Sequence, residues 1–266
     1  MILPVVSVTD RKLMADRFSR AAGTYDRYAE HHRLIAVELL EMIQSIECRR
    51  VLELGCGTGI LSSGMRRLFP KSQMVLTDSA PGMVSECRNR VNPSSLVRHT
   101  IWDFERAECS SIYDLIVSSC ALQWLTDPVA FGVKLFNMVS PGGFTVHAIP
   151  VKGMLREFED SFYLTGGQWP SLRYISSRRW DSILHNSGFT VIESSTKTFS
   201  VKYSSPTDAL RAVRGIGATL SGHDGVPKLR PGFLRSALNF YGETYRDEKG
   251  RVPVSYKIHF VKAARL

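Results

Sequence analysis

Short apolar segments alternate with amphipathic segments along residues 51–149 of the chain. The apolar segments predict five buried strands, at residues 51–54, 73–77, 96–102, 113–118 and 144–149. Between them, apolar residues three and four positions apart predict helices at residues 61–69, 79–89 and 128–139. Such connections are too long for hairpins. The pattern therefore favours an α/β doubly wound, mostly parallel sheet, with a ligand site at the carboxyl ends of its strands.

The flanking regions predict further helices and two more strands. Helices are predicted at residues 9–20 and 31–46, before the first strand, and we expect Gly23 to end the first of them. Residues 151–177 give no clear pattern. Beyond them, strands are predicted at 189–203 and 252–264, and helices at 177–187, 206–220 and 233–245. The first two helices lie outside the βαβ units, so we expect them to fold over a ligand site.

Composition narrows the class of protein. The chain has 266 residues and a net charge of +9, which favours an acidic partner or an anionic substrate, or is simply a solvated surface. It has no helix-turn-helix, zinc-finger or RNP pattern, so nucleic acid is not expected as a partner. It has no long apolar run and no signal-peptide pattern, so no membrane partner is expected. Its five scattered cysteines lack CxxC pairs. They predict a cytoplasmic protein without disulfides or a metal site.

A glycine-rich turn follows the first predicted strand. Its sequence places Glu53 two residues before Gly55, in the order Glu-Leu-Gly-Cys-Gly-Thr-Gly. Glycine allows positive φ and lets a ligand approach the backbone, and the helix that follows offers unpaired N–H groups. Acidic residues also end the second and third predicted strands, at Asp78 and Asp103. Because these strand ends meet at one edge of a parallel sheet, we expect the three acids to line one site.

The spacing of this motif discriminates between cofactors. A dinucleotide fingerprint, Gly-x-Gly-x-x-Gly, needs glycine where Ile60 stands, and the Gly-Lys-Ser/Thr of a P-loop is absent. Glu53 would repel a pyrophosphate but suits the ammonium group of S-adenosylmethionine. Asp78 is then expected to hold the ribose hydroxyls, with Asp103 and Phe104 holding the adenine. The predicted cofactor contacts also include Gly55, Cys56, Gly57, Gly59, Ser79, Met83 and Ser119.

The motif and its surroundings resemble known families. Residues 51–149 resemble the class I methyltransferases, which implies a seven-strand sheet whose last strand is antiparallel. Four further segments, FSRAAGTYDRYAEHH, SSCALQWLTDP, LRAVRGIGAT and VPVSYKIHFVKAAR, resemble the malonyl-acyl-carrier-protein O-methyltransferases of biotin synthesis. The segment ALQWL also resembles trans-aconitate-type methyltransferases. Both families methylate carboxylates.

The resemblance implies a substrate and its contacts. The expected acceptor is the free carboxylate of malonyl-acyl carrier protein or malonyl-CoA, whose methyl ester would prime the pimeloyl moiety of biotin. A carboxylate is already anionic at neutral pH, so the reaction needs no general base. We expect Arg211 to orient this carboxylate and Tyr25 to donate a hydrogen bond to it, with Arg214 as the alternative to Arg211. Gln123 and Trp124 are expected to border the transferring methyl group.

Three other functions remain open from the residues alone. The chain could methylate a small free polycarboxylic acid, or it could be a non-catalytic scaffold that binds S-adenosylmethionine or no cofactor. A nucleic-acid methyltransferase rests on charge alone. In each case we expect one domain over residues 1–266. It would contain a helical flap (1–46), a cofactor-binding core (47–150) and a substrate half (151–266) with a helical lid at about 204–248.

Overall fold

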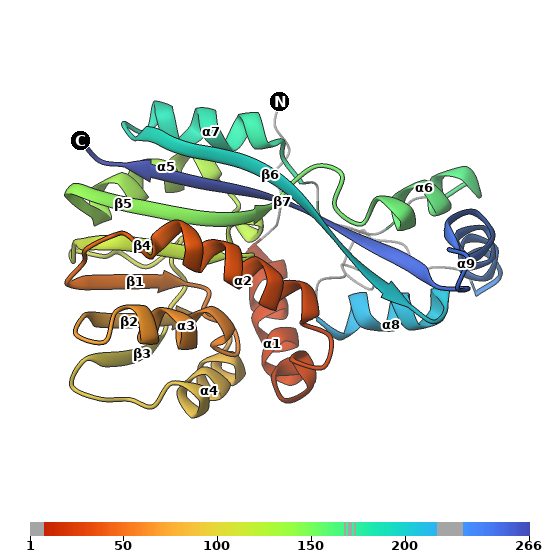
Figure 1. Cartoon of the computed structure of the whole chain (residues 1–266), viewed down its shortest axis with the longest axis horizontal. Helices are drawn as coiled ribbons and strands as arrows, with labels where there is room; N and C mark the ends of the chain where they lie inside the picture. Colours follow the sequence, from red (N-terminus) through yellow and green to blue (C-terminus); the bar gives the residue numbers. More distant parts are fainter. Residues whose placement is uncertain (1–7, 168, 170–171, 173, 217–230) are drawn as a thin grey trace.

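A seven-stranded sheet organises the part of the chain that the structure describes. The structure is a computed structural model that describes residues 8–167, 169, 172, 174–216 and 231–266. Its strand order is β3-β2-β1-β4-β5-β7-β6 (Figure 1). The strands are β1 (Arg50–Leu54), β2 (Gln73–Asp78), β3 (Val97–Ile101), β4 (Tyr113–Ser119), β5 (Val139–Pro150), β6 (Thr190–Tyr203) and β7 (Val252–Ala264). Strands β1 to β5 are parallel, and β7 runs antiparallel to both β5 and β6. The predicted fold class is confirmed.

Helices cover both faces of this sheet. The described helices are α1 (Val8–Tyr25), α2 (Glu30–Ile43), α3 (Ile60–Leu68), α4 (Pro81–Arg90), α5 (Pro128–Met138), α6 (Arg156–Leu164), α7 (Ser177–Asn186), α8 (Pro206–Gly215) and α9 (Pro231–Tyr245). Successive residues of β1 point to opposite sides. Val51 packs in the core beneath α2 and α3, and Leu52 packs in the core beneath α5 and α7. Both faces of the strand are therefore buried, as its largely apolar sequence favours.

Local sequence explains where many of these helices begin. Proline occupies the first turn of α4, α5 and α8, where its missing N–H leaves no hydrogen bond unmade. Asp127 caps α5 by accepting from the N–H groups of Val129 and Ala130, and Ser176 and Ser205 cap α7 and α8 in the same way. These caps fix the points at which the chain leaves the sheet.

Three segments differ from the sequence predictions. Gly23 does not end the first helix, because α1 continues to Tyr25. A glycine costs a helix only about 1 kcal/mol, and packing of α1 against α4 offsets that cost. Helix α6 forms within residues 151–177, where no element was predicted, and it buries Phe158 and Phe162. Strand β5 begins at Val139, before the strand predicted at residues 144–149, and its pairing with β4 is irregular over this added part.

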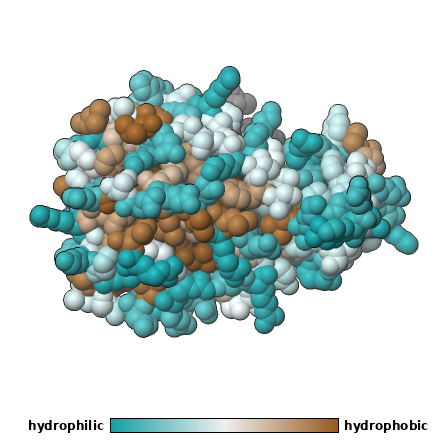
Figure 2. Space-filling model, in the orientation of Figure 1, coloured by the Kyte–Doolittle hydropathy of each residue, from teal (hydrophilic) through white to brown (hydrophobic). Residues whose placement is uncertain are grey.

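The hairpin of β6 and β7 extends past the other strands and carries α8 and α9 at its far end (Figure 1). Helix α1 stands between this extension and the parallel strands, in contact with α4 and α8. Hydrophilic side chains dominate the α8–α9 end of the face seen in Figure 2. No helix among the described residues is long and apolar enough to span a membrane.

Candidate active site

A cavity opens at the carboxyl ends of β1, β2 and β4, beneath α1. Its empty space, including the open mouth, is about 1330 Å³. The parallel register sets the residues at its floor, because Glu53 on β1 lies beside Leu76 on β2 and Val117 on β4. Most of the predicted site residues line this cavity: Tyr25, Glu53, Gly55, Cys56, Gly57, Asp78, Ser79, Met83, Asp103, Phe104, Ser119, Gln123 and Trp124.

The glycine turn forms one wall of the cavity. Gly55, Gly57 and Gly59 all have positive φ, at 75°, 54° and 85°. A Cβ on Gly55 would lie 2.3 Å from the Cβ of Ala121, whereas one on Gly57 would meet nothing within 4 Å. Gly55 is therefore required for packing, and Gly57 leaves backbone open toward the cavity. Gly59 lies outside the cavity lining, where it precedes α3 and packs against Cys87.

Glu53 supplies a buried acid at the floor of the cavity. Only 1% of its surface is exposed, and Ser62 Oγ donates to its Oε2 at 2.5 Å. Burial raises the pKa of Glu53 well above its ordinary value, the nearby Cys87 and Asp78 raise it further, and the Ser62 hydrogen bond acts in the opposite direction. A buried carboxyl group with one protein partner is suited to a ligand cation such as an ammonium group.

Asp78 closes the glycine turn and faces the same cavity. Its carboxylate accepts from the N–H of Gly57 at 3.0 Å and from the N–H of Ala80 at 2.9 Å. Burial raises the pKa of Asp78, while these N–H groups act in the opposite direction. The turn is also held to β2 by a hydrogen bond from the N–H of Cys56 to the carbonyl of Thr77, at 2.7 Å. Asp78 is thus fixed by the backbone that it helps to shape.

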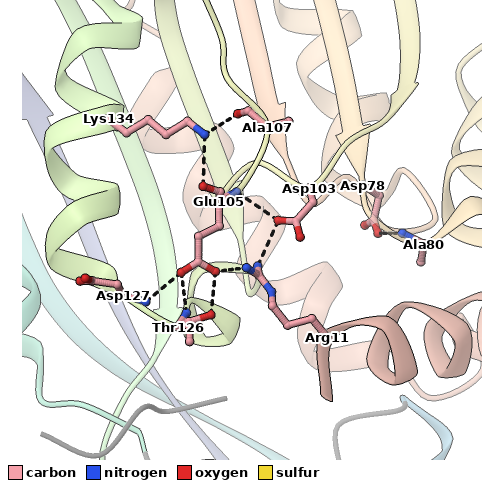
Figure 3. A network of polar contacts seen from close by, with 9 residues as sticks. All are labelled: Arg11, Asp78, Ala80, Asp103, Glu105, Ala107, Thr126, Asp127 and Lys134. Carbon is pink, nitrogen blue, oxygen red and sulfur yellow. Dashed lines mark hydrogen bonds and ion pairs between the residues drawn. The ribbon is translucent and has the colours of Figure 1, made fainter. Parts of the chain in front are cut away.

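An ion-pair network ties α1 to the third acidic position (Figure 3). Arg11 Nη2 lies 3.3 Å from Asp103 Oδ1, and Arg11 Nη1 donates to Glu105. Glu105 also accepts from both the N–H and the hydroxyl of Thr126 and from the N–H of Asp127. Arg11 was not identified from the sequence. It lies 94 positions from Glu105 along the chain, and no local pattern indicates a contact over that separation.

Another part of the lining, the acceptor wall, holds Tyr25, Gln123 and Trp124, which are predicted to contact the acceptor or border the methyl group. Tyr25 Oη lies 2.8 Å from His32 Nε2, and burial raises the pKa of Tyr25 far above its ordinary value. Gln123 Nε2 donates to the carbonyl of Cys120 at 2.6 Å. The ring of Trp124 packs edge-on against Phe18 of α1, with centroids 5.7 Å apart.

Arg211 and Arg214 do not line the cavity in this structure. Both are exposed on α8, and Arg211 pairs with Asp208 at 2.5 Å. The same helix nevertheless reaches the site at its end, because Ile216 lines the cavity and a Cβ on Gly215 would lie 2.4 Å from the Tyr28 ring. Residues 217–230 of the expected lid lie outside the described residues, and the part that follows them includes α9.

Several lining residues were missed from the sequence. These are Arg11, His31, His32, Cys120 and Tyr174. Cys120 is recognisable as a site residue only from the structure. Its φ of 53° is unusual for a residue other than glycine and indicates a constrained backbone. The two histidines follow Tyr25 closely in sequence, but only their rings' placement on α2 shows that they face the cavity.

The order of the three acids across the sheet would suit the polar groups of S-adenosylmethionine. Glu53 lies on β1, Asp78 ends β2 and Asp103 follows the end of β3, and these three strands are neighbours in the sheet. Glu53 would take the ammonium group, the turn at Gly57 the amino-acid portion, Asp78 the ribose, and Asp103 with Phe104 the adenine. Within the described residues, no group of three His, Cys, Asp or Glu side chains could hold a metal ion.

Fold and site together define a class I S-adenosylmethionine-dependent methyltransferase. A methyltransferase-domain family profile matches residues 52–145. A protein of Bacillus halodurans C-125, described as a candidate methyltransferase, shares the fold with a TM-score of 0.59 at 15% identity, over 85% of this chain and 96% of that one. The predicted cofactor and enzyme class are confirmed.

Full-length relatives identify the family. The malonyl-[acyl-carrier protein] O-methyltransferase of Brevibacillus brevis is 30% identical over 95% of this chain and 96% of its own length. The enzyme of the same name from Marinomonas sp. (strain MWYL1) is 29% identical, over 100% of this chain and 98% of its own. The chain belongs to the malonyl-[acyl-carrier protein] O-methyltransferase family, which confirms the resemblance drawn from its sequence.

Proposed function

We propose that the protein transfers a methyl group from S-adenosylmethionine to the free carboxylate of a malonyl thioester on acyl carrier protein. The observation that carries this proposal is the end-to-end similarity to malonyl-[acyl-carrier protein] O-methyltransferases. It is supported by a cavity whose lining contains both Tyr25 and the three acids of the predicted cofactor site. The methyl ester would be a neutral primer for the pimeloyl moiety of biotin. The net charge of +9 suits an acidic carrier protein.

The proposed reaction is an in-line displacement. A carboxylate oxygen forms a bond to the methyl carbon, the carbon–sulfur bond breaks, and its electron pair returns to sulfur, which leaves S-adenosylhomocysteine. No proton moves, so the protein needs no general base. Its residues bring the two groups together and exclude water, and such positioning can lower a barrier by about 7–11 kcal/mol.

We assign roles to the acceptor-side residues on this basis. Tyr25 retains its proton because burial raises its pKa, so it is a neutral donor to the carboxylate. Arg211, or Arg214, would reach the carboxylate when the lid closes, and Gln123 and Trp124 would border the methyl group. This scheme keeps residues 1–46 as a flap, 47–150 as the cofactor core and 151–266 as the substrate half with its lid at about 204–248, in one cytoplasmic domain.

The test offers the protein four acceptors in parallel with S-adenosylmethionine. These are malonyl-acyl carrier protein, malonyl-CoA, trans-aconitate and the unacylated carrier protein, and intact mass reports the gain of one methyl group. We expect methylation of malonyl-acyl carrier protein and none of the unacylated carrier. Protein that binds S-adenosylmethionine but methylates neither malonyl thioester contradicts the proposal, and methylation of trans-aconitate alone would indicate the small-acid alternative.

A further inference from the structure

A stack of aromatic rings joins the flap to the last strand along the acceptor wall. Tyr25 ends α1, and His31 and His32 lie in the first turn of α2. The His32 ring stacks on Tyr25 with centroids 5.5 Å apart and lies 4.1 Å from the His31 ring. His31 in turn stacks on Tyr256 of β7, with centroids 3.7 Å apart and planes 8° from parallel. The His32 ring is therefore held between two neighbours.

Both partners of the Tyr25–His32 hydrogen bond are neutral near pH 7. Burial raises the pKa of Tyr25 far above its ordinary value, and the charges of Cys120, Asp78 and Asp26 raise it further. Burial lowers the pKa of His32 to about 4, with Asp26 opposing this effect and Arg33 adding to it. Tyr25 thus has one proton to donate, and His32 has one N–H and one lone pair.

Two arrangements of this hydrogen bond are possible, and they differ in what faces the cavity. If Tyr25 donates to His32 Nε2, its hydroxyl proton is used and its oxygen would repel a carboxylate. If His32 Nε2 carries the hydrogen and donates to Tyr25 Oη, the Tyr25 proton is free to point at the acceptor. Only the second arrangement binds a carboxylate.

The other residues that line the cavity offer few cationic groups that could bind a carboxylate, so the Tyr25 hydroxyl is important as a donor. Among the described residues that line the cavity, Arg11 is the single permanent cation, and it is paired with Asp103 and Glu105. Until Arg211 or Arg214 closes over the site, a carboxylate that enters therefore meets the Tyr25 hydroxyl and no unpaired guanidinium of this lining. A neutral donor orients the oxygen without neutralising the charge that makes it nucleophilic.

We propose that His32 is a positioning residue, which donates from Nε2 to Tyr25 Oη and so directs the Tyr25 proton to the carboxylate of the acceptor. The role rests on the proposed function, because it requires an anionic acceptor. The His32 ring packs against His31, which is itself stacked on Tyr256.

A double-mutant cycle tests the coupling. The variants are Tyr25→Phe, His32→Leu and the two combined, assayed on malonyl-acyl carrier protein. We expect each single variant to lower kcat by roughly 10- to 100-fold, the range for loss of a hydrogen bond to a charged group. In the Tyr25→Phe background, His32→Leu should have no further effect, because His32 acts through the hydroxyl that is already missing.

A conservative variant and a matched control separate this role from a structural one. His32→Gln keeps an N–H donor and should recover activity to within a few-fold of the wild type. His185→Leu makes the same change at an exposed histidine of α7 and should leave activity unchanged. Calorimetry with S-adenosylmethionine should give wild-type affinity for every variant, which shows that each one is folded.

Three results would overturn the role of His32 in an active enzyme. They are unchanged kcat in His32→Leu, effects of the two single variants that multiply in the double variant, and a His32→Gln variant as impaired as His32→Leu. Failure of the proposed function has a different signature, because the wild-type protein itself would then leave malonyl-acyl carrier protein unmethylated.

Discussion

The cofactor side and the acceptor side of the cavity are built differently. On the cofactor side, Glu53, Asp78 and Asp103 stand at or just beyond the ends of neighbouring parallel strands, and the register brings them together. On the acceptor side, Tyr25 comes from a flap helix, and Arg211 lies on α8 with 61% of its side chain exposed. A sheet fixes the first set of side chains, whereas the second depends on how separate helices close over it.

The largest expected effect is on the cofactor side, at Asp78. Asp78→Ala removes the acceptor of two backbone hydrogen bonds and, on our assignment, the partner of the ribose. Hydrogen bonds to charged groups contribute about 1.5–3 kcal/mol each, so we expect S-adenosylmethionine affinity to fall by roughly 100-fold or more. Calorimetry measures this, with Asp78→Asn as the variant that keeps one acceptor oxygen. Affinity within threefold of the wild type would show that the ribose lies elsewhere.

The same contrast explains what the sequence could predict. Strands and their terminal acids are encoded locally, by short strand-like segments with an acid at or near the carboxyl end, so Glu53, Asp78 and Asp103 could be placed from their spacing. Arg11 and His32 could not, because their partners are set by how α1 and α2 pack against distant loops. Helix α6 was missed for a related reason: its buried aromatic residues pack against α9 and β7, which no local pattern records.

Arg211→Ala tests the acceptor side. If Arg211 reaches the carboxylate when the lid closes, its loss should lower kcat/KM for malonyl-acyl carrier protein by roughly 10- to 100-fold, since a charge-assisted hydrogen bond is lost. Affinity for S-adenosylmethionine should stay unchanged. Arg214→Ala is the matched variant, one helical turn away and also exposed. A larger loss in Arg214→Ala would assign the role to Arg214, and loss of cofactor affinity in Arg211→Ala would contradict the division into two sides.

A pH titration probes the buried acid of the cofactor side. Burial raises the folded-state pKa of Glu53 above its unfolded value of 4.5. Between pH 4.5 and this raised pKa, Glu53 stays protonated in the free protein. An ammonium group favours the carboxylate, so cofactor affinity should rise with pH in that window, by up to about tenfold per unit, with release of a proton. The stability of the free protein should fall over the same window, because folding disfavours the charged form.

Calorimetry of cofactor binding in two buffers of different ionisation enthalpy measures the number of protons released on binding. Glu53→Gln keeps the size of the side chain and cannot titrate, so its affinity should be lower and should lose this part of the pH dependence. Equal pH dependence in wild type and Glu53→Gln would mean that another group releases the proton, and the ammonium would then have to be placed away from Glu53.

The smallest expected effect is at the junction of the two sides, where Arg11 of the flap pairs with Asp103 and Glu105. Arg11→Ala leaves Glu105 with its hydrogen bonds from Thr126 and Asp127. The free energy of unfolding should therefore fall by about 1–2 kcal/mol, which is less than for a buried charge left without any partner. Because α1 then loses its tether beside the adenine position, S-adenosylmethionine should dissociate roughly three- to tenfold faster. Lys12→Ala, at an exposed position of the same helix, removes the same charge and should change neither quantity. Equal dissociation rates in Arg11→Ala and Lys12→Ala would show that the flap covers the cofactor without help from this ion pair.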